Sequence, residues 1–461
     1  MIPHGFARDG NHAAELAVIA GSDMDMESSL YVSQLVSLVK SGKVDVEIIN
    51  DAVRRILRVK YELGLFKDPY KYCNKERSDS ELASDENMSV ALDAAKKSIV
   101  LLKNNNQLLP LEKEGEKIAI IGPLANDKNS PLGNWRSQAV YNSATSVVEA
   151  MDKYNGNKTI FEKGVDLYYG KTNFHNRVKI NYDDRSGFSK AKFAAANSDV
   201  VIMVLGEEGN QSGEGRSRTN IGLPGLQLEL LKEISKVNNN IVLVVMSGRP
   251  LDLTWEDENI PAIVQAWHLG SKSGDAIAQV LYGDYNPSGK LTMSFPRNVG
   301  QVPVYYNFKN TGRPSTSIEQ VTNSGYADVE NSPLYPFGFG LSYTNFKYSN
   351  LTIDSSELDY NSKINITVKI ENTGFLTGKE VAQLYIRDIV GSIARPMKEL
   401  KGFEIIELAP GESKVVNFEI DSSLLEFYTY ENKWEAEVGK FHAFIGTNSD
   451  VSDFKEFHLV K

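Results

Sequence analysis

Five short apolar runs between residues 99 and 266 constrain the fold of this 461-residue chain more than any other feature. They are Ile99-Val-Leu-Leu, Ile118-Ala-Ile-Ile, Val200-Val-Ile-Met-Val-Leu, Ile241-Val-Leu-Val-Val-Met and Ala262-Ile-Val-Gln-Ala. Each run is rich in β-branched residues, as strands buried on both faces are. Helical patterns lie between them, over residues 188–197, 224–236 and 274–282. This alternation predicts a mostly parallel sheet with helices on both faces.

The segments on either side of this region follow different patterns. Before it, residues 11–20, 30–40 and 48–60 are patterned as helices, with no convincing strand between them, as in the tail of a larger fold. After it, partial period-2 alternation over residues 364–370, 380–386, 414–420 and 440–445 predicts an immunoglobulin- or fibronectin-type sandwich. We therefore expect a multidomain chain of α/β plus all-β class.

Composition excludes several classes of function. The formal net charge of −10 and the pI near 5.3 argue against nucleic acid as a partner. A single cysteine, Cys73, rules out an internal disulfide framework. No apolar run approaches the roughly 20 residues that span a bilayer, so we expect no membrane span. The N-terminal residues lack the charged and apolar regions of a signal peptide.

Motif spacing excludes further chemistry. Five residues rather than four separate Gly283 from Gly289, and Leu291 stands where a phosphate-binding loop needs Ser or Thr. No Gly-x-Gly-x-x-Gly follows any predicted strand, which removes the usual dinucleotide fingerprint. The six histidines never pair at i, i+3 or i+4 spacing. We therefore expect neither a cofactor nor a metal site. Catalysis by carboxylate side chains is the candidate chemistry that remains.

The long segment over residues 206–231, between a predicted strand and a predicted helix, is the strongest candidate for function. It holds glycines and glutamates but nothing apolar before Ile221. Ordered loops of this length are often functional, and α/β folds place chemistry at the carboxyl ends of their strands. Our hypothesis is that Glu214 is a catalytic acid. The alternative is a solvated glutamate on a mobile surface loop.

Several segments, in their order along the chain, resemble glycoside hydrolase family 3, and within it the periplasmic-type bacterial β-glucosidases. They include Ala20-Gly-Ser-Asp-Met-Asp-Met, Leu63-Gly-Leu-Phe, Leu132-Gly-Asn-Trp, Gly248-Arg-Pro and Leu334-Tyr-Pro-Phe-Gly-Phe-Gly-Leu-Ser-Tyr-Thr. The resemblance covers essentially the whole chain. It implies a (β/α)8 barrel, an α/β sandwich domain and a fibronectin type III-like domain, in that order.

The resemblance implies the following domains. Residues 1–66 correspond to the C-terminal remnant of the barrel, and residues 67–97 to a linker and lead-in helix. Residues 98–296 correspond to the family's C-terminal α/β sandwich domain. Residues 297–347 form a structured connection, and residues 348–461 the fibronectin type III-like domain. The chain would thus be an N-terminally truncated member with most of its barrel missing.

The implied activity is retaining hydrolysis of terminal β-D-glucosyl residues, with Glu214 aligned to the general acid/base. The family carries its nucleophilic aspartate in a Ser-Asp-Trp segment, and this chain contains none. We therefore expect the chain alone to be inactive. Full-length relatives would be periplasmic or secreted. Two alternatives stay open: β-xylosides as substrates, and a non-catalytic carbohydrate-binding or interaction protein built from the two C-terminal domains.

Overall fold

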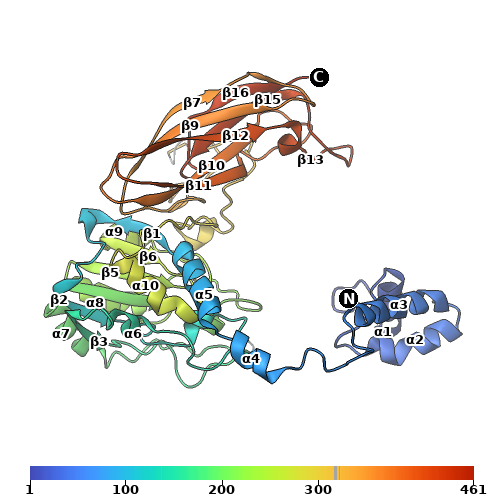
Figure 1. The fold of residues 1–461 in the computed structure, drawn as a ribbon, viewed down its shortest axis with the longest axis horizontal. Coiled ribbons are helices and arrows are strands. Elements are labelled where there is room, and N and C mark those ends of the chain that lie inside the picture. The colour runs from blue at the N-terminus through green and yellow to red at the C-terminus, as the bar shows by residue number, and fades with distance from the viewer. Residues whose placement is uncertain (137, 316–318, 321) are drawn as a thin grey trace. The chain divides into compact units, whose positions relative to one another are not determined.

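The computed structural model describes residues 1–136, 138–315, 319–320 and 322–461 (Figure 1). It divides into two compact units, Met1–Ser84 and Asp85–Lys461. No helix in the described part of the chain is both long and apolar enough to cross a membrane.

The N-terminal unit is helical. Its helices are α1 (Gly10–Ile19), α2 (Leu30–Lys40), α3 (Val46–Glu62) and α4 (Lys75–Glu81). The first three confirm the predicted helices, and the structure assigns no strand within residues 1–84, all of which it describes. Side chains cap three helix starts: Asp9 accepts from the His12 backbone N–H, Asp45 from that of Glu47, and Asn74 from that of Arg77. The apolar core of this unit is small, as expected for three short helices with one apolar stripe each: Ala14, Val18, Leu38 and Val44.

Helix α5 (Asp85–Ser98) leads into a six-stranded sheet with the order β1-β6-β5-β4-β2-β3. The strands are β1 (Val100–Asn104), β2 (Glu114–Ile121), β3 (Gly156–Glu162), β4 (Val200–Gly206), β5 (Ile241–Met246) and β6 (Ala262–Gln265). All neighbours pair in parallel except β1 and β6, which are antiparallel. The mostly parallel sheet is therefore confirmed. Strand β3 was not predicted, because this edge strand has alternating exposed and half-buried residues instead of a continuous apolar run.

Helices cover both faces of this sheet. They are α6 (Val147–Met151), α7 (Phe188–Ala196), α8 (Gln227–Ser235), α9 (Thr254–Asn259) and α10 (Ser273–Leu281). One core cluster packs α5, α6 and α10 against one face, and a second packs α7 and α8 against the other. The three predicted helices are confirmed as α7, α8 and α10, although α8 begins at Gln227 and not at residue 224.

The segment after residue 296 runs on to the C-terminal domain, whose first strand, β7, begins at Phe346. Part of it lies along the edge of the sheet, where the Leu341 backbone N–H donates to the Leu101 carbonyl at 2.8 Å. A buried ion pair then joins the two domains. Lys290 Nζ lies 3.1 Å from Glu380 Oε2, and the Tyr348 hydroxyl donates to Glu380 Oε1 at 3.0 Å.

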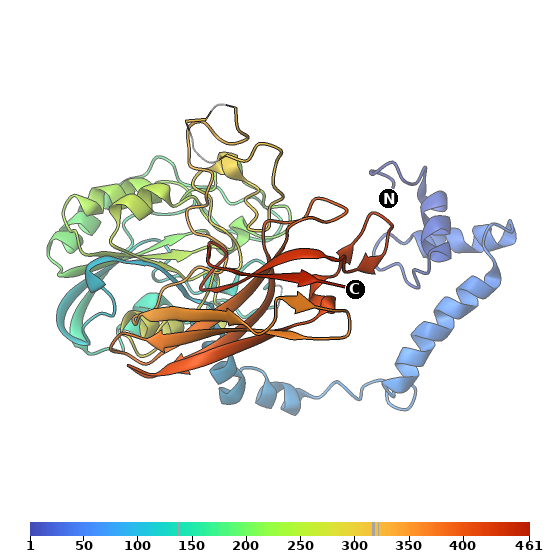
Figure 2. The same ribbon diagram turned by 90° about the horizontal axis from the view of Figure 1, so that it is seen from above.

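The C-terminal domain is a β-sandwich (Figures 1 and 2). One sheet has the order β11-β10-β15-β16-β8, and the other β12-β9-β7. Their strands are β7 (Phe346–Ile353), β8 (Glu357–Leu358), β9 (Ile364–Asn372), β10 (Gly378–Asp388), β11 (Glu399–Leu408), β12 (Ser413–Ile420), β15 (Gly439–Gly446) and β16 (Lys455–Leu459). A small hairpin of β13 (Phe427–Tyr428) and β14 (Trp434–Glu435) completes it. The predicted strands are confirmed as β9, β10, β12 and β15. Strand β11 was not predicted because its apolar and polar residues do not alternate regularly.

Candidate active site

The candidate loop leaves the sheet at the carboxyl end of β4. Gly206 ends the strand with φ of +142°, and a Cβ there would lie 1.8 Å from the Met246 carbonyl oxygen on β5. No side chain fits in that space, so a glycine is required at this turn. The loop returns to the sheet at α8, which begins with Gln227.

Gln227 closes the base of the loop. It is fully buried, and its side-chain amide donates to the carbonyls of Gly206 at 2.8 Å and Pro224 at 2.9 Å. Its Oε1 accepts from the Gly206 backbone N–H at 2.9 Å. The last residue of β4 and the start of α8 are therefore held together by one side chain.

Glu207 is fully buried and forms the charged centre of the loop. Arg218 Nη1 donates to its Oε1 at 2.6 Å, and Arg249 Nε lies 3.1 Å from the same oxygen. Two guanidinium groups around one carboxylate offset the cost of burying it. Next to this cluster, burial lowers the pKa of His268, whose Nε2 lies 3.4 Å from the Glu207 carbonyl oxygen.

Glu208 fixes the following turn. Its carboxylate accepts from the Asn210 backbone N–H at 2.7 Å and from the Thr172 hydroxyl at 2.9 Å. Arg136 Nη2 lies 3.5 Å from the same carboxylate, and the side chain of Glu208 is 2% exposed. Both glutamates that precede Glu214 in the loop are therefore committed to holding it in place.

Glu214, the residue predicted to be catalytic, lies at the exposed tip of the loop. The flanking Gly213 and Gly215 have φ of +101° and +68°, which turns the chain back on itself at this position. Within the described residues, the Glu214 carboxylate has no hydrogen bond and no ion pair. The two nearby arginines are engaged elsewhere: Arg218 binds Glu207, and Arg216 donates to the Phe174 carbonyl oxygen. Glu214 is thus free to meet a ligand.

A cavity of about 990 Å³ lies beside this loop, and Glu208 and Asn210 line part of it. Trp135, which is 71% exposed, lies on its wall with its ring centroid 6.4 Å from that of Phe174. Asn134 also lines it, and its buried amide has no hydrogen-bond partner among the described residues. Exposed rings beside polar groups suit a sugar, which presents both C–H faces and hydroxyls.

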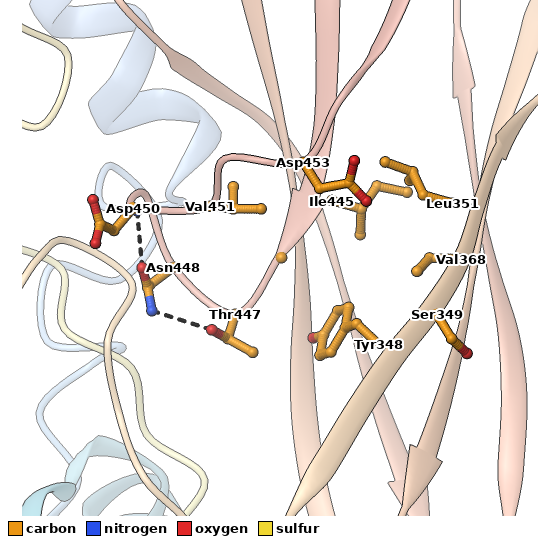
Figure 3. A pocket seen from close by; sticks show the side chains of 11 residues that line it. Tyr348, Ser349, Leu351, Val368, Ile445, Thr447, Asn448, Asp450, Val451 and Asp453 are labelled. Carbon is orange, nitrogen blue, oxygen red and sulfur yellow. Dashed lines mark hydrogen bonds between the residues drawn. The ribbon is translucent and has the colours of Figure 1, made fainter.

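A second pocket, of about 410 Å³, lies in the β-sandwich (Figure 3). Most of its apolar side chains come from β7, β9 and β15, and most of its polar groups come from the loop after β15. The polar groups of this loop bind one another: Asn448 donates to Thr447 at 3.1 Å and accepts from the Asp450 backbone N–H at 2.8 Å. The described residues contain no group of three or more His, Cys, Asp or Glu side chains placed to hold a metal ion.

Sequence reasoning singled out Glu214 but gave no role to the residues that hold its loop. Glu207 and Glu208 were counted only as glutamates of the loop. Arg249 and Trp135 were noted only within segments of resemblance. Long-range contacts, such as that between Arg249 and Glu207, leave no periodicity in the sequence that could reveal them.

Comparisons with known proteins agree with this architecture. Residues 99–343 match the glycosyl hydrolase family 3 C-terminal domain, and residues 380–449 match a fibronectin type III-like domain. A "Periplasmic beta-glucosidase" of Salmonella typhimurium is 42% identical over 97% of this chain and 60% of its own length. A "Beta-xylosidase" of Formosa agariphila is 36% identical over 99% of this chain and 62% of its own length.

Solved structures give the same result. A β-glucosidase from Listeria innocua, in complex with glucose, superposes with a TM-score of 0.90 at 35% identity, covering 99% of this chain and 61% of that one. The chain therefore spans about 60% of the length of the relatives it matches. The matched domains, their order and their shared fold establish that this chain belongs to glycosyl hydrolase family 3.

Proposed function

We propose that this chain is the acid/base-bearing part of a retaining β-glucosidase, with Glu214 as the general acid/base. The observation that carries the proposal is the contrast within one loop. Glu207 and Glu208 are buried and fully engaged, whereas Glu214 is exposed and unpaired at the tip. The relatives named β-glucosidases support the reaction class.

Retaining hydrolysis requires two carboxyl groups about 5–5.5 Å apart. Glu214 would protonate the leaving oxygen while a second carboxylate attacks the anomeric carbon. It would then take a proton from the water that releases the sugar. The sequence contains no Ser-Asp-Trp segment to supply the second carboxylate. We therefore propose that the nucleophile comes from polypeptide outside residues 1–461. Residues 1–461 alone would then hydrolyse no β-glucoside.

The proposed substrate is a terminal β-D-glucoside, in line with the printed names of the Salmonella and Listeria relatives. β-Xylosides are the alternative substrate, because a Formosa relative of similar coverage is named a β-xylosidase. The Salmonella relative also supports a periplasmic or secreted location.

Reconstitution tests the proposal. The chain is co-expressed with the part of the Salmonella relative that the match leaves uncovered, and hydrolysis of 4-nitrophenyl β-glucoside is measured. We expect turnover by this reconstituted enzyme, none by either part alone, and a large loss on Glu214→Gln. Glu229→Gln, on the exposed face of α8, is the matched control. Turnover that survives Glu214→Gln unchanged would refute the assignment.

Non-catalytic carbohydrate binding is the second candidate function. The exposed Trp135 beside Phe174 favours it, since aromatic rings in an open cavity bind sugar faces without any catalytic group. Cellobiose binding by the chain, together with an inactive reconstituted complex, would favour this candidate over the hydrolase.

A further inference from the structure

We propose that Arg249 is a positioning residue that holds the loop carrying Glu214 in its working geometry, with the buried Glu207 as its anchor. The inference rests on the proposed role of Glu214 as acid/base. Arg249 follows β5, whereas the loop follows β4, so the contact joins two neighbouring strand ends of the sheet.

One nitrogen of Arg249 holds both ends of the turn that carries Glu214. Nη2 donates to the Gln211 carbonyl at 2.5 Å and to the Arg216 carbonyl at 2.8 Å. These carbonyls lie on either side of residues 212–215. Glu214 is therefore at the tip of a short segment whose two ends are fixed to the same atom.

Arg249 is itself held from two directions, through its guanidinium and through its backbone carbonyl. Its Nε lies 3.1 Å from Oε1 and 3.2 Å from Oε2 of the fully buried Glu207. The Arg249 carbonyl accepts from the Ser247 hydroxyl at 2.8 Å, and that hydroxyl accepts from Gln265 Nε2 at 3.0 Å. Ser247 and Gln265 are fully buried, so the anchoring runs back into the sheet.

Close packing keeps the turn against this anchor. A Cβ on Gly248 would lie 2.0 Å from the Ser212 hydroxyl oxygen. A side chain at residue 248 would therefore push the start of the turn outward. Glycine at residue 248 is thus a physical requirement of this loop position.

Lysine cannot replace arginine in this arrangement. A guanidinium is planar and presents several N–H donors in a fixed fork, so it binds Glu207 through Nε and the two carbonyls through Nη2. An ammonium on a flexible stem would keep the charge against Glu207 but not span all three acceptors. Arg249→Lys therefore loosens the turn while retaining the buried ion pair.

Displacing Glu214 would slow most the hydrolysis of substrates whose leaving group must be protonated. Proton donation by a positioned acid contributes about 10²–10⁴-fold, and a misplacement of about 1 Å can cost about 100-fold. A poor leaving group, such as the glucose of cellobiose, needs that proton as the bond breaks. The weakly basic 2,4-dinitrophenolate leaves without it. Poor positioning thus affects the two substrates unequally, whereas general unfolding affects them alike.

The test compares kcat/KM for cellobiose and for 2,4-dinitrophenyl β-glucoside in the reconstituted enzyme. For Arg249→Lys we expect a fall of about 100-fold with cellobiose and less than about 3-fold with the dinitrophenyl substrate. Arg185→Lys is the matched control, because Arg185 pairs with Glu229 in the same domain, away from the loop. Equal losses on both substrates, or no loss on either, would overturn the proposal.

A measurement on the chain alone separates this inference from the proposed function. Hydrogen exchange of the Arg216 backbone amide, which donates to the Gly213 carbonyl within the turn, should accelerate at least about tenfold in Arg249→Lys, while β4 stays protected. Faster exchange with an inactive reconstituted complex would support the positioning of the loop and refute its catalytic use. Unchanged exchange would overturn the positioning role whatever the activity.

Discussion

Glu256 makes the stability of the chain depend on pH in a direction opposite to most carboxylates. It lies on α9, is 2% exposed, and its Oε1 has no hydrogen-bond partner among the described residues. Burial raises its pKa from 4.5 to about 7, with a smaller contribution from the negative charge of Asp252. Between these two values the folded chain keeps a proton that the unfolded chain has lost.

The sign and size of the effect follow from this difference. Because the folded state binds the extra proton, its stabilisation is complete below pH 4.5 and is lost as the pH rises through 7. Each pH unit in that interval corresponds to about 1.4 kcal/mol, so the free energy of unfolding falls by about 3 kcal/mol. Glu256→Gln removes the titrating group, so this contribution to the pH dependence of stability is absent from the variant.

The assay is urea unfolding, followed by tryptophan fluorescence, at pH steps from 4.5 to 7.5. The free energy of unfolding of the unaltered chain minus that of Glu256→Gln should fall by about 3 kcal/mol over this range. Glu258→Gln, an exposed change on the same helix, is the control. A difference that stays constant, or that grows with pH, would refute the reasoning.

Two further changes test contacts that hold the fold together. Lys290→Met leaves the Glu380 carboxylate buried without its cation, and we expect a loss of about 3–5 kcal/mol in urea unfolding, most of it recovered by adding Glu380→Gln. A small loss, or no recovery, would show that the pair does not join the domains. Gln227→Leu leaves the backbone N–H and carbonyl of Gly206 unpaired, and should cost about 2 kcal/mol or more in the same measurement. An unchanged unfolding midpoint would contradict the closure of the loop by this side chain.

Much of the fold could be predicted because burial leaves a local pattern in the sequence. Strands β4 and β5 are buried along their whole length, so they read as continuous apolar runs. Helix α3 carries a clear apolar stripe and ends before Gly64. Edge strands such as β3 are exposed on one side and leave no such run.

The candidate site was predictable only in part. The glycines around Glu214 mark a loop with unusual backbone angles, and this much can be read locally. The contacts that hold the loop cannot be read locally, because Arg249 and Glu207 are 42 residues apart in the sequence. The loop suggests Glu214 as a candidate, but the proposed general acid/base role rests on resemblance, since a glutamate on a glycine-rich loop has many other uses.

The most direct test of the central claim is rescue of Glu214→Ala by azide in the reconstituted enzyme. With 2,4-dinitrophenyl β-glucoside, this variant should form the glycosyl-enzyme but release it slowly, because no base activates water. Azide is a nucleophile that needs no base and can enter the space the carboxylate leaves. We predict a large increase in kcat with azide and β-glucosyl azide as the product. Full turnover without azide, or no glycosyl azide at any azide concentration, would contradict the assignment of Glu214.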